Sequence, residues 1–219
     1  MNMNFERARF NMVEQQVRPW EVIDERILSQ MEAIQREDFV PVKHRKLAFA
    51  DLSIPLAHGE FMMRPTVEGR MLQAIALDED DTALEIGTGS GYVTACLAGL
   101  CKRVCSVEIH EDLHQDASAR LQEKGIDNVE LFLGDAMSGW QPEQAHDVVV
   151  VTGSVPVVPE SFLGWVNPGG RLFVVTGDSP AMEARLLTRL GVSDWSEESL
   201  FETDLPRLIN SVPPPVFEF

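Results

Sequence analysis

A glycine-rich turn directly after an apolar run is the part of this sequence that most clearly indicates chemistry. Residues 83–86, Ala-Leu-Glu-Ile, lead into Gly-Thr-Gly-Ser-Gly at 87–91. Glycine lets the backbone turn tightly and lets a ligand approach where a Cβ would clash. A helix expected after the turn would direct its N-terminal N–H groups at that ligand. The stretch is therefore typical of the nucleotide side of a cofactor site.

Two further acidic residues stand directly after apolar runs. Glu108 follows residues 104–107, and Asp135 follows residues 129–134. Because the carboxyl ends of parallel strands meet at one edge of a sheet, we expect both side chains to lie beside the glycine turn. Either acid alone is also compatible with a helix cap or a surface ion pair. Their placement at matching strand ends favours a shared ligand site.

The residues around the turn discriminate between cofactor classes. A dinucleotide fingerprint requires a small residue at its sixth position, where this chain has Tyr92, and no Lys-Ser or Lys-Thr pair supplies a phosphate loop. S-adenosylmethionine, a nucleoside without a pyrophosphate, is the favoured cofactor, and a dinucleotide is the alternative. Glu108 would accept hydrogen bonds from the ribose hydroxyls, Asp135 from the adenine amine, and Glu85 would hold the methionine part. The residues expected to bind this cofactor are Glu85, Gly87, Thr88, Gly89, Gly91, Glu108, Asp135 and Ala136.

The elements that position these groups follow from hydrophobic periodicity. From residue 82 onward apolar runs alternate with amphipathic segments, which predicts an α/β fold with a doubly wound, mostly parallel, Rossmann-like sheet. Strands are expected over 82–86, 103–107, 130–133, 147–151 and 171–176, with helices over 92–100, 111–124, 159–166 and 181–190. An N-terminal helical extension is expected over 5–17, 22–34 and 66–76. We divide the chain into 1–77, helices with a substrate-side loop, and 78–219, the cofactor-binding core with a C-terminal arm and a proline-rich end at 212–216.

Composition narrows the partners. The chain has 219 residues, 44% of them hydrophobic, and a formal net charge of −17. Such a charge repels phosphate backbones and anionic lipid, so neither nucleic acid nor a membrane is an expected partner. No apolar run reaches the length of a membrane span, and the first residues lack a signal-peptide core, so we expect a cytoplasmic location.

Cysteine and histidine usage indicates no metal. Cys96, Cys101 and Cys105 are crowded into one helix and the following strand, which favours reduced core thiols. His110 and His114 complete a His-Glu-x-x-His string, but no third ligand follows at a convincing spacing. We therefore expect no metal site.

Taken together, the motifs resemble the protein-L-isoaspartate O-methyltransferase family. Residues 84–92 and 105–108 match its cofactor motifs, and Arg-Glu-Asp-Phe-Val-Pro at 36–41 with Pro-Gly-Gly at 168–170 is more specific to it. The resemblance covers most of the chain, from about residue 13 to about residue 177. It implies a class I methyltransferase fold, S-adenosylmethionine as methyl donor, and methylation of a carboxylate on a damaged aspartyl residue of a peptide or protein. It does not indicate an oligomeric state.

One loop departs from this resemblance. Family members carry Gly-Gln-Thr-Ile-Ser-Gln-Pro, with the Thr and Ser near the methyl group and the substrate carboxylate, whereas this chain has Gly-Glu-Phe-Met-Met-Arg-Pro at 59–65. The candidate substrate-side residues are His58, Phe61, Met63 and Arg64. A carboxylate that loses a hydroxyl partner is held less well by about 1 to 3 kcal/mol.

Three functions stay open on the sequence. The first is isoaspartyl repair that tolerates the altered loop. The second is methylation of a different, small-molecule acceptor that suits Phe61 and Met63. The third is a non-catalytic module that binds the cofactor or another protein.

Overall fold

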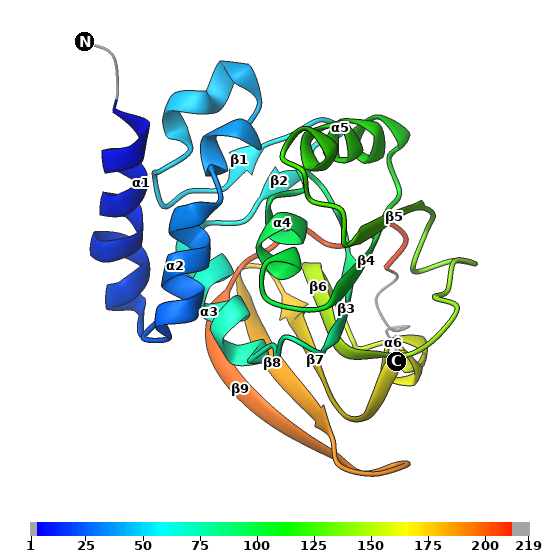
Figure 1. Ribbon diagram of the computed structural model, residues 1–219. Helices are drawn as coiled ribbons and strands as arrows, with labels where there is room; N and C mark the ends of the chain where they lie inside the picture. The colour runs from blue at the N-terminus through cyan, green and yellow to red at the C-terminus, as the bar shows by residue number, and fades with distance from the viewer. Residues whose placement is uncertain (1–3, 212–219) are drawn as a thin grey trace.

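The computed structural model describes residues 4–211, which form an α/β fold around a seven-stranded sheet (Figure 1). The strands are β1 Ile54–Pro55, β2 Phe61–Met62, β3 Thr82–Ile86, β4 Arg103–Glu108, β5 Val129–Leu133, β6 His146–Val155, β7 Val166–Asp178, β8 Ala181–Arg189 and β9 Trp195–Thr203. The α-helices are α1 Phe5–Met12, α2 Glu25–Ala33, α3 Pro65–Ile75, α4 Tyr92–Ala98, α5 Glu111–Glu123 and α6 Glu160–Gly164.

The main sheet has the order β5-β4-β3-β6-β7-β8-β9. Pairing is parallel from β5 through β7, and β8 and β9 add to that edge in antiparallel direction. The predicted mostly parallel, doubly wound sheet is confirmed. The carboxyl ends of β3, β4, β5 and β6 consequently lie along one edge, as the site requires.

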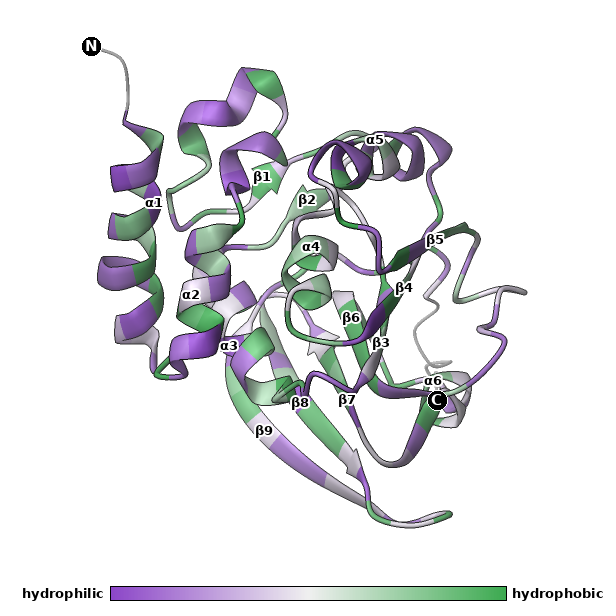
Figure 2. Ribbon diagram, in the orientation of Figure 1, coloured by the Kyte–Doolittle hydropathy of each residue, from purple (hydrophilic) through white to green (hydrophobic). Residues whose placement is uncertain are grey.

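Both faces of this sheet are buried. The four valines at 148–151 of β6 have no solvent exposure. Val148 and Val150 join one hydrophobic cluster, with residues of α1 to α4, whereas Val149 and Val151 join a second cluster with Phe162 of α6. Strands covered on both faces read as continuous apolar runs. Outer helices such as α1 alternate between hydrophilic and hydrophobic residues (Figure 2).

The N-terminal segment is helical as predicted. The side chain of Asn4 caps α1 by accepting from the Arg7 N–H, and α1 continues through a π-helical segment, Val13–Val17, into a 3₁₀ turn, Arg18–Trp20. The chain then turns at Glu21, which has a left-handed φ of 63°. Further on, β1 and β2 pair antiparallel and present the loop between them towards α5 (Figure 1).

The predicted helix over 181–190 is wrong, because this segment is strand β8. The buried residues of β8 are Met182 and Ala184, which join one hydrophobic cluster, and Leu187, which joins the cluster on the other face of the sheet. That spacing does not alternate and imitates a helical pattern. Pairing with β7 on one side and β9 on the other overrides the local helix propensity. Strand β9 itself was not predicted, since most of its residues are exposed at the sheet edge.

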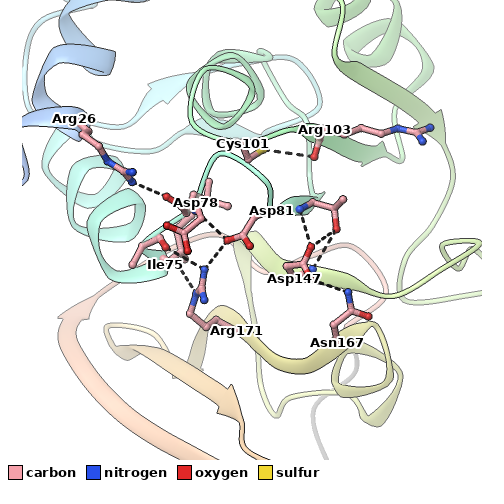
Figure 3. A network of polar contacts seen from close by, with 12 residues as sticks. Arg26, Ile75, Asp78, Asp81, Cys101, Arg103, Asp147, Asn167 and Arg171 are labelled. Carbon is pink, nitrogen blue, oxygen red and sulfur yellow. Dashed lines mark hydrogen bonds and ion pairs between the residues drawn. The ribbon is translucent and has the colours of Figure 1, made fainter.

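Polar contacts at the amino ends of the strands join β3, β6, β7 and α3 (Figure 3). Arg171 of β7 donates to the last carbonyl of α3 at 2.6 Å and to Asp81 at 2.8 Å. Asp147 of β6 accepts from the Thr82 N–H and hydroxyl, both at 2.8 Å, and from Asn167 at 2.9 Å. Both charged groups therefore find their hydrogen-bond partners within the chain.

Three further predictions, on the cysteines, the domain division and the proline-rich end, have different outcomes. The cysteines are buried and unpaired, as expected of core thiols. The division after residue 77 stays a prediction, and one hydrophobic cluster contains residues from both sides of it, such as Met71 and Ala83. The proline-rich end at 212–216 lies outside the described residues. Within residues 4–211, every helix is too short or too polar to cross a membrane.

Candidate functional site

A cleft crosses the carboxyl ends of the central strands. It holds about 700 Å³ of empty space, part of it open to solvent, and a smaller pocket of about 310 Å³ shares five wall residues with it. Of the predicted residues, the cleft is lined by Phe61, Gly87, Gly89, Glu108, Asp135 and Ala136, and the smaller pocket by Phe61, Met63, Glu85, Gly87, Thr88 and Gly89. The structure thus brings most of the predicted site together at one edge of the sheet.

The glycine turn is shaped by positive φ angles and close contacts. Gly87 and Gly89 have φ of 98° and 54° and face the cleft. A Cβ on Gly87 would lie 2.5 Å from Thr152 Oγ1, so a side chain there would displace the hydroxyl that donates to the Gly87 carbonyl at 2.6 Å. Gly91 lines neither cavity, and a Cβ there would lie 3.2 Å from the Cβ of Ala117 on α5. Its glycine therefore serves the packing of the turn against α5.

Glu108 ends β4 as a buried carboxylate held by backbone N–H groups. Its Oε2 accepts from Gly89 at 2.8 Å, and its Oε1 accepts from Ile109 at 2.9 Å and His110 at 3.0 Å. Each carboxylate oxygen has two lone pairs, so Oε2 can accept another hydrogen bond. The side chain thus ties the glycine turn to the end of β4 and still offers an acceptor to a ligand in the cleft.

Asp135 presents its carboxylate to an amide group of the C-terminal segment. Its Oδ1 accepts from the Met137 N–H at 2.9 Å, and its Oδ2 accepts from Asn210 Nδ2 at 2.7 Å. The amide –NH₂ of Asn210 thus donates to the side chain that the sequence analysis assigned to the adenine amine. Sequence reasoning missed Asn210, because it lies far along the chain in a segment without a motif. Ala136 lines the cleft beside Asp135.

Glu85 is wholly buried beneath the smaller pocket. Its Oε2 accepts from Thr94 at 2.5 Å and Ser106 at 2.6 Å, while its Oε1 has no partner within residues 4–211. Burial raises the pKa of Glu85 to about 8, and hydrogen bonds from Ser106 and Thr94 oppose that shift. An unpartnered buried oxygen calls for an explanation, and a ligand with a positive or hydrogen-bond-donating group supplies one.

These groups fit a nucleoside ligand that also carries positive charge. Glu108 and Asp135 offer acceptors at two places along one cleft, as hydroxyls and an amine require. Gly87 and Gly89 line the cleft with backbone that carries no side chain. Glu85 adds a buried acceptor in the adjoining pocket. These three side chains are acidic hydrogen-bond acceptors, whereas a pyrophosphate needs donors or positive charge.

The four substrate-side candidates are divided between the cavities and the surface. Phe61 is 43% exposed and lines both cavities, whereas Met63 is buried and lines the smaller pocket. Arg64 immediately precedes α3, lines neither cavity and makes no ion pair within residues 4–211. The loop therefore offers the cavities apolar side chains at 61 and 63 and no hydroxyl.

His58 lies outside the cavities, on the exposed loop between β1 and β2. Its φ is 57°, its Nε2 lies 2.8 Å from Asp112 Oδ1, and its ring stacks on His110 at 4.0 Å. The contact joins this loop to the beginning of α5. Within the part of the chain that the structure describes, no three His, Cys, Asp or Glu side chains gather as a metal site would require.

A buried ion pair supports the substrate-side loop from below. Arg36 Nη1 donates to both oxygens of Glu68, at 2.7 and 2.5 Å, and its Nη2 donates to the Met63 carbonyl at 2.8 Å. Both side chains are almost completely buried, and Glu68 lines the smaller pocket. The pair fixes the backbone of Met63 beside that pocket. Spacing alone did not mark Arg36 or Glu68 as site residues.

Comparison with known proteins agrees with this geometry. The sequence profile described as protein-L-isoaspartate(D-aspartate) O-methyltransferase matches residues 8–193. A protein-L-isoaspartate O-methyltransferase of Opitutus terrae is 39% identical over 187 residues, covering 84% of this chain and 79% of that protein. One of Rhodopseudomonas palustris is 38% identical over 190 residues, covering 86% and 87%.

A solved structure gives the same architecture. It is a Plasmodium falciparum protein assigned as a protein-L-isoaspartate O-methyltransferase and crystallised with S-adenosyl-L-homocysteine. The two folds agree with a TM-score of 0.79 over 91% of this chain and 97% of that one, at 18% sequence identity. The likeness concerns the fold, which has the class I methyltransferase arrangement.

Proposed function

This chain belongs to the protein-L-isoaspartate(D-aspartate) O-methyltransferase family of S-adenosylmethionine-dependent enzymes, and we propose that it methylates the carboxylate of an isoaspartyl residue. One observation carries the proposal: three acidic side chains lie beside the glycine turn. Glu108 and Asp135 line the cleft, and Glu85 lines the adjoining smaller pocket. The names of the relatives favour an enzyme over a non-catalytic module.

Each part of the cofactor has a matching group in this arrangement. Glu108 Oε2 would accept from the ribose hydroxyls, Asp135 beside Ala136 from the adenine amine, and Glu85 Oε1 from the methionine part. The backbone at Gly87 and Gly89 lets that part lie close to the turn. Asp135 Oδ2 already accepts from the Asn210 amide, so the adenine amine would use its second lone pair or take the place of that amide.

The chemistry asks little of the side chains beyond orientation. When bound, S-adenosylmethionine supplies a methyl group activated by the positive charge of its sulfonium. An ionised acceptor carboxylate is already a nucleophile, so the site needs no general base, and alignment of the reacting atoms contributes most of the rate. The chain aligns the acceptor by holding the loop at 56–63, whose backbone Arg36 fixes at Met63. Phe61 of this loop lines the cleft with an apolar ring.

A second candidate function rests on that same loop. Phe61 and Met63 present apolar surface where the family carries hydroxyls, which would suit an apolar small-molecule acceptor. Such an enzyme would consume the cofactor with that acceptor and leave isoaspartyl peptides unmethylated.

Two measurements on one preparation test the proposal. Calorimetric titration of S-adenosylhomocysteine is compared for the wild type, Glu108→Ala and the control Glu111→Ala, an exposed acidic neighbour that does not line the cleft. We expect binding by the wild type and the control and a large loss in Glu108→Ala. Methyl transfer is then followed with an isoaspartyl peptide and its aspartyl counterpart.

The outcomes separate the cofactor from the acceptor. Wild type that fails to bind S-adenosylhomocysteine contradicts the cofactor assignment. Binding without transfer to the isoaspartyl peptide contradicts the repair function and favours the second candidate. Equal transfer to both peptides contradicts specificity for the damaged residue.

A further inference from the structure

The C-terminal strap, residues 204–211, crosses the carboxyl ends of β6 and β7. Ser154 of β6 fixes it at three points: its N–H donates to the Pro206 carbonyl at 2.8 Å, its hydroxyl donates to the Leu205 carbonyl at 2.8 Å, and its carbonyl accepts from the Leu208 N–H at 2.8 Å. The strap is therefore held like an additional short strand. Its residues from Pro206 to Ile209 form one wall of the cleft.

Arg207 is one of the residues that line the cleft, and its guanidinium group reaches the end of β7. Its Nη2 pairs with Asp178 at the end of β7 and donates to the Gly177 carbonyl at 3.2 Å. Its Nη1 is buried and has no hydrogen-bond partner within residues 4–211. Leaving a charged donor unpaired and shielded from water costs free energy, which a ligand anion would recover. The contacts of Nη2 hold the side chain, while the donors of Nη1 are left unused.

Sheet order places Arg207 away from the groups assigned to the cofactor. Asp135 follows β5, Glu108 ends β4 and Glu85 lies near the end of β3, three strands that are neighbours in the sheet. Arg207 is anchored at β6 and β7, on the other side of β3. Phe61 lines the same cleft from the substrate-side loop. The cleft is therefore lined by the strap and by the substrate-side loop together.

We propose that Arg207 Nη1 binds the acceptor carboxylate, in place of the two hydroxyls that Phe61 and Met63 have removed from the loop. The inference rests on the proposed function, because that function supplies a carboxylate acceptor. A guanidinium donates strongly to carboxylates, and Asp178 orients it without occupying Nη1. It also attracts an anion into the cleft of a chain whose net charge is −17.

Binding of an isoaspartyl peptide to protein saturated with S-adenosylhomocysteine tests this role without turnover. Peptide binding is measured by fluorescence anisotropy for the wild type, Arg207→Ala and Arg207→Lys, and S-adenosylhomocysteine binding is measured by calorimetry for each. We expect Arg207→Ala to weaken peptide binding about 10- to 100-fold, the effect of one hydrogen bond to a charged group. Arg207→Lys should recover part of that loss, and the cofactor-product affinity should stay within about twofold.

Repeating the Arg207 substitution in a loop variant distinguishes a role of Arg207 in substrate binding from a structural role. In the double variant Phe61→Thr with Met63→Ser, the restored hydroxyls share the carboxylate, so removal of Arg207 should cost less than about threefold. A purely structural contribution would cost the same in both backgrounds, and that result would overturn the proposal.

Three other results would also overturn it: unchanged peptide affinity in Arg207→Ala, a parallel loss of S-adenosylhomocysteine, which would place Arg207 in the cofactor site, or no peptide binding by the wild type. Wild type that binds the peptide in an Arg207-dependent manner but transfers no methyl group would contradict the proposed function alone.

Discussion

The two ends of the central sheet use the same kinds of side chain in opposite ways. At the amino end, Asp147 and Arg171 find their partners within the chain (Figure 3). At the carboxyl end, Glu85 keeps one oxygen and Arg207 one nitrogen buried without a partner among residues 4–211. Asp147 and Arg171 stabilise the fold through these contacts, whereas the unpartnered atoms of Glu85 and Arg207 are left for a ligand.

The pKa values of one carboxylate from each end, the partly exposed Asp147 and the buried Glu85, express this difference. Burial would raise the pKa of Asp147, but hydrogen bonds from Thr82 and Asn167 outweigh burial and hold it below its usual value. Burial dominates at Glu85 and raises its pKa to about 8. A site that keeps such a group without sufficient partners is less stable in the empty protein, a cost that binding sites commonly carry.

The largest expected effect is at Glu108. Glu108→Ala should weaken S-adenosylhomocysteine binding about 100-fold, because it removes the acceptor for the ligand and the tie between the glycine turn and β4. Calorimetric titration measures the loss, with Glu108→Gln retaining one of the acceptor oxygens as an intermediate case. Unchanged affinity in Glu108→Ala would show that the carboxyl end is not specialised for this ligand.

Asp147→Ala tests the opposite end. Three hydrogen bonds from Thr82 and Asn167 lose their acceptor, so the free energy of unfolding should fall by about 1 to 3 kcal/mol. Urea unfolding measures this value. S-adenosylhomocysteine affinity of the remaining folded protein should match the wild type, and a large loss of affinity would contradict the separation of the two ends.

Glu85→Gln tests the contrast between the raised pKa of Glu85 and the lowered pKa of Asp147. The folded pKa of Glu85, about 8, lies above its usual value of 4.5, so the folded protein holds the proton more tightly than the unfolded chain. Its contribution to stability is therefore complete below pH 4.5 and is lost as pH rises towards 8, by at most about 1.4 kcal/mol per pH unit.

Unfolding of the ligand-free protein in urea, at pH 6, 7 and 8, measures that loss. Glu85→Gln should flatten the decline, gaining stability relative to the wild type as pH rises, while S-adenosylhomocysteine binding weakens. A decline as steep in the variant as in the wild type would mean that another group causes it.

The smallest expected effect is at Arg26, a half-exposed residue at the amino end that donates to the Leu77 carbonyl at 2.5 Å (Figure 3). Arg26→Ala should lower the free energy of unfolding by less than about 1 kcal/mol, because water can replace an exposed donor. Thermal unfolding measures the change. A fall as large as that of Asp147→Ala would place Arg26 among the principal supports of the amino end.

Much of the cofactor half could be predicted from the sequence. Strand β3 was predicted with its observed bounds, and Glu108 and Asp135 lie at the ends of their strands as expected. These signals are local: a strand, its turn and the following residue form one motif. Parallel pairing then brings motifs of the same kind to one edge.

Two predictions differ from what the structure shows, although the local sequence supported them. Residues 181–190 have good helix formers, yet pairing on both sides makes them strand β8. Gly91 belongs to the turn motif, but the proximity of Ala117 gives it a packing role. In both cases a neighbour remote in sequence decides.

The acceptor half depended on the tertiary structure. Phe61, Ser154 and Arg207 come from three remote segments, and no spacing rule relates them. Their meeting depends on how β6 positions the strap and how Arg36 and Glu68 hold the loop. The sequence by itself determined the fold class, the glycine turn and the acidic strand ends, because short-range motifs and parallel pairing specify them. Only tertiary packing decided which buried charges are satisfied within the chain and which are left for a ligand, because that depends on contacts between distant segments.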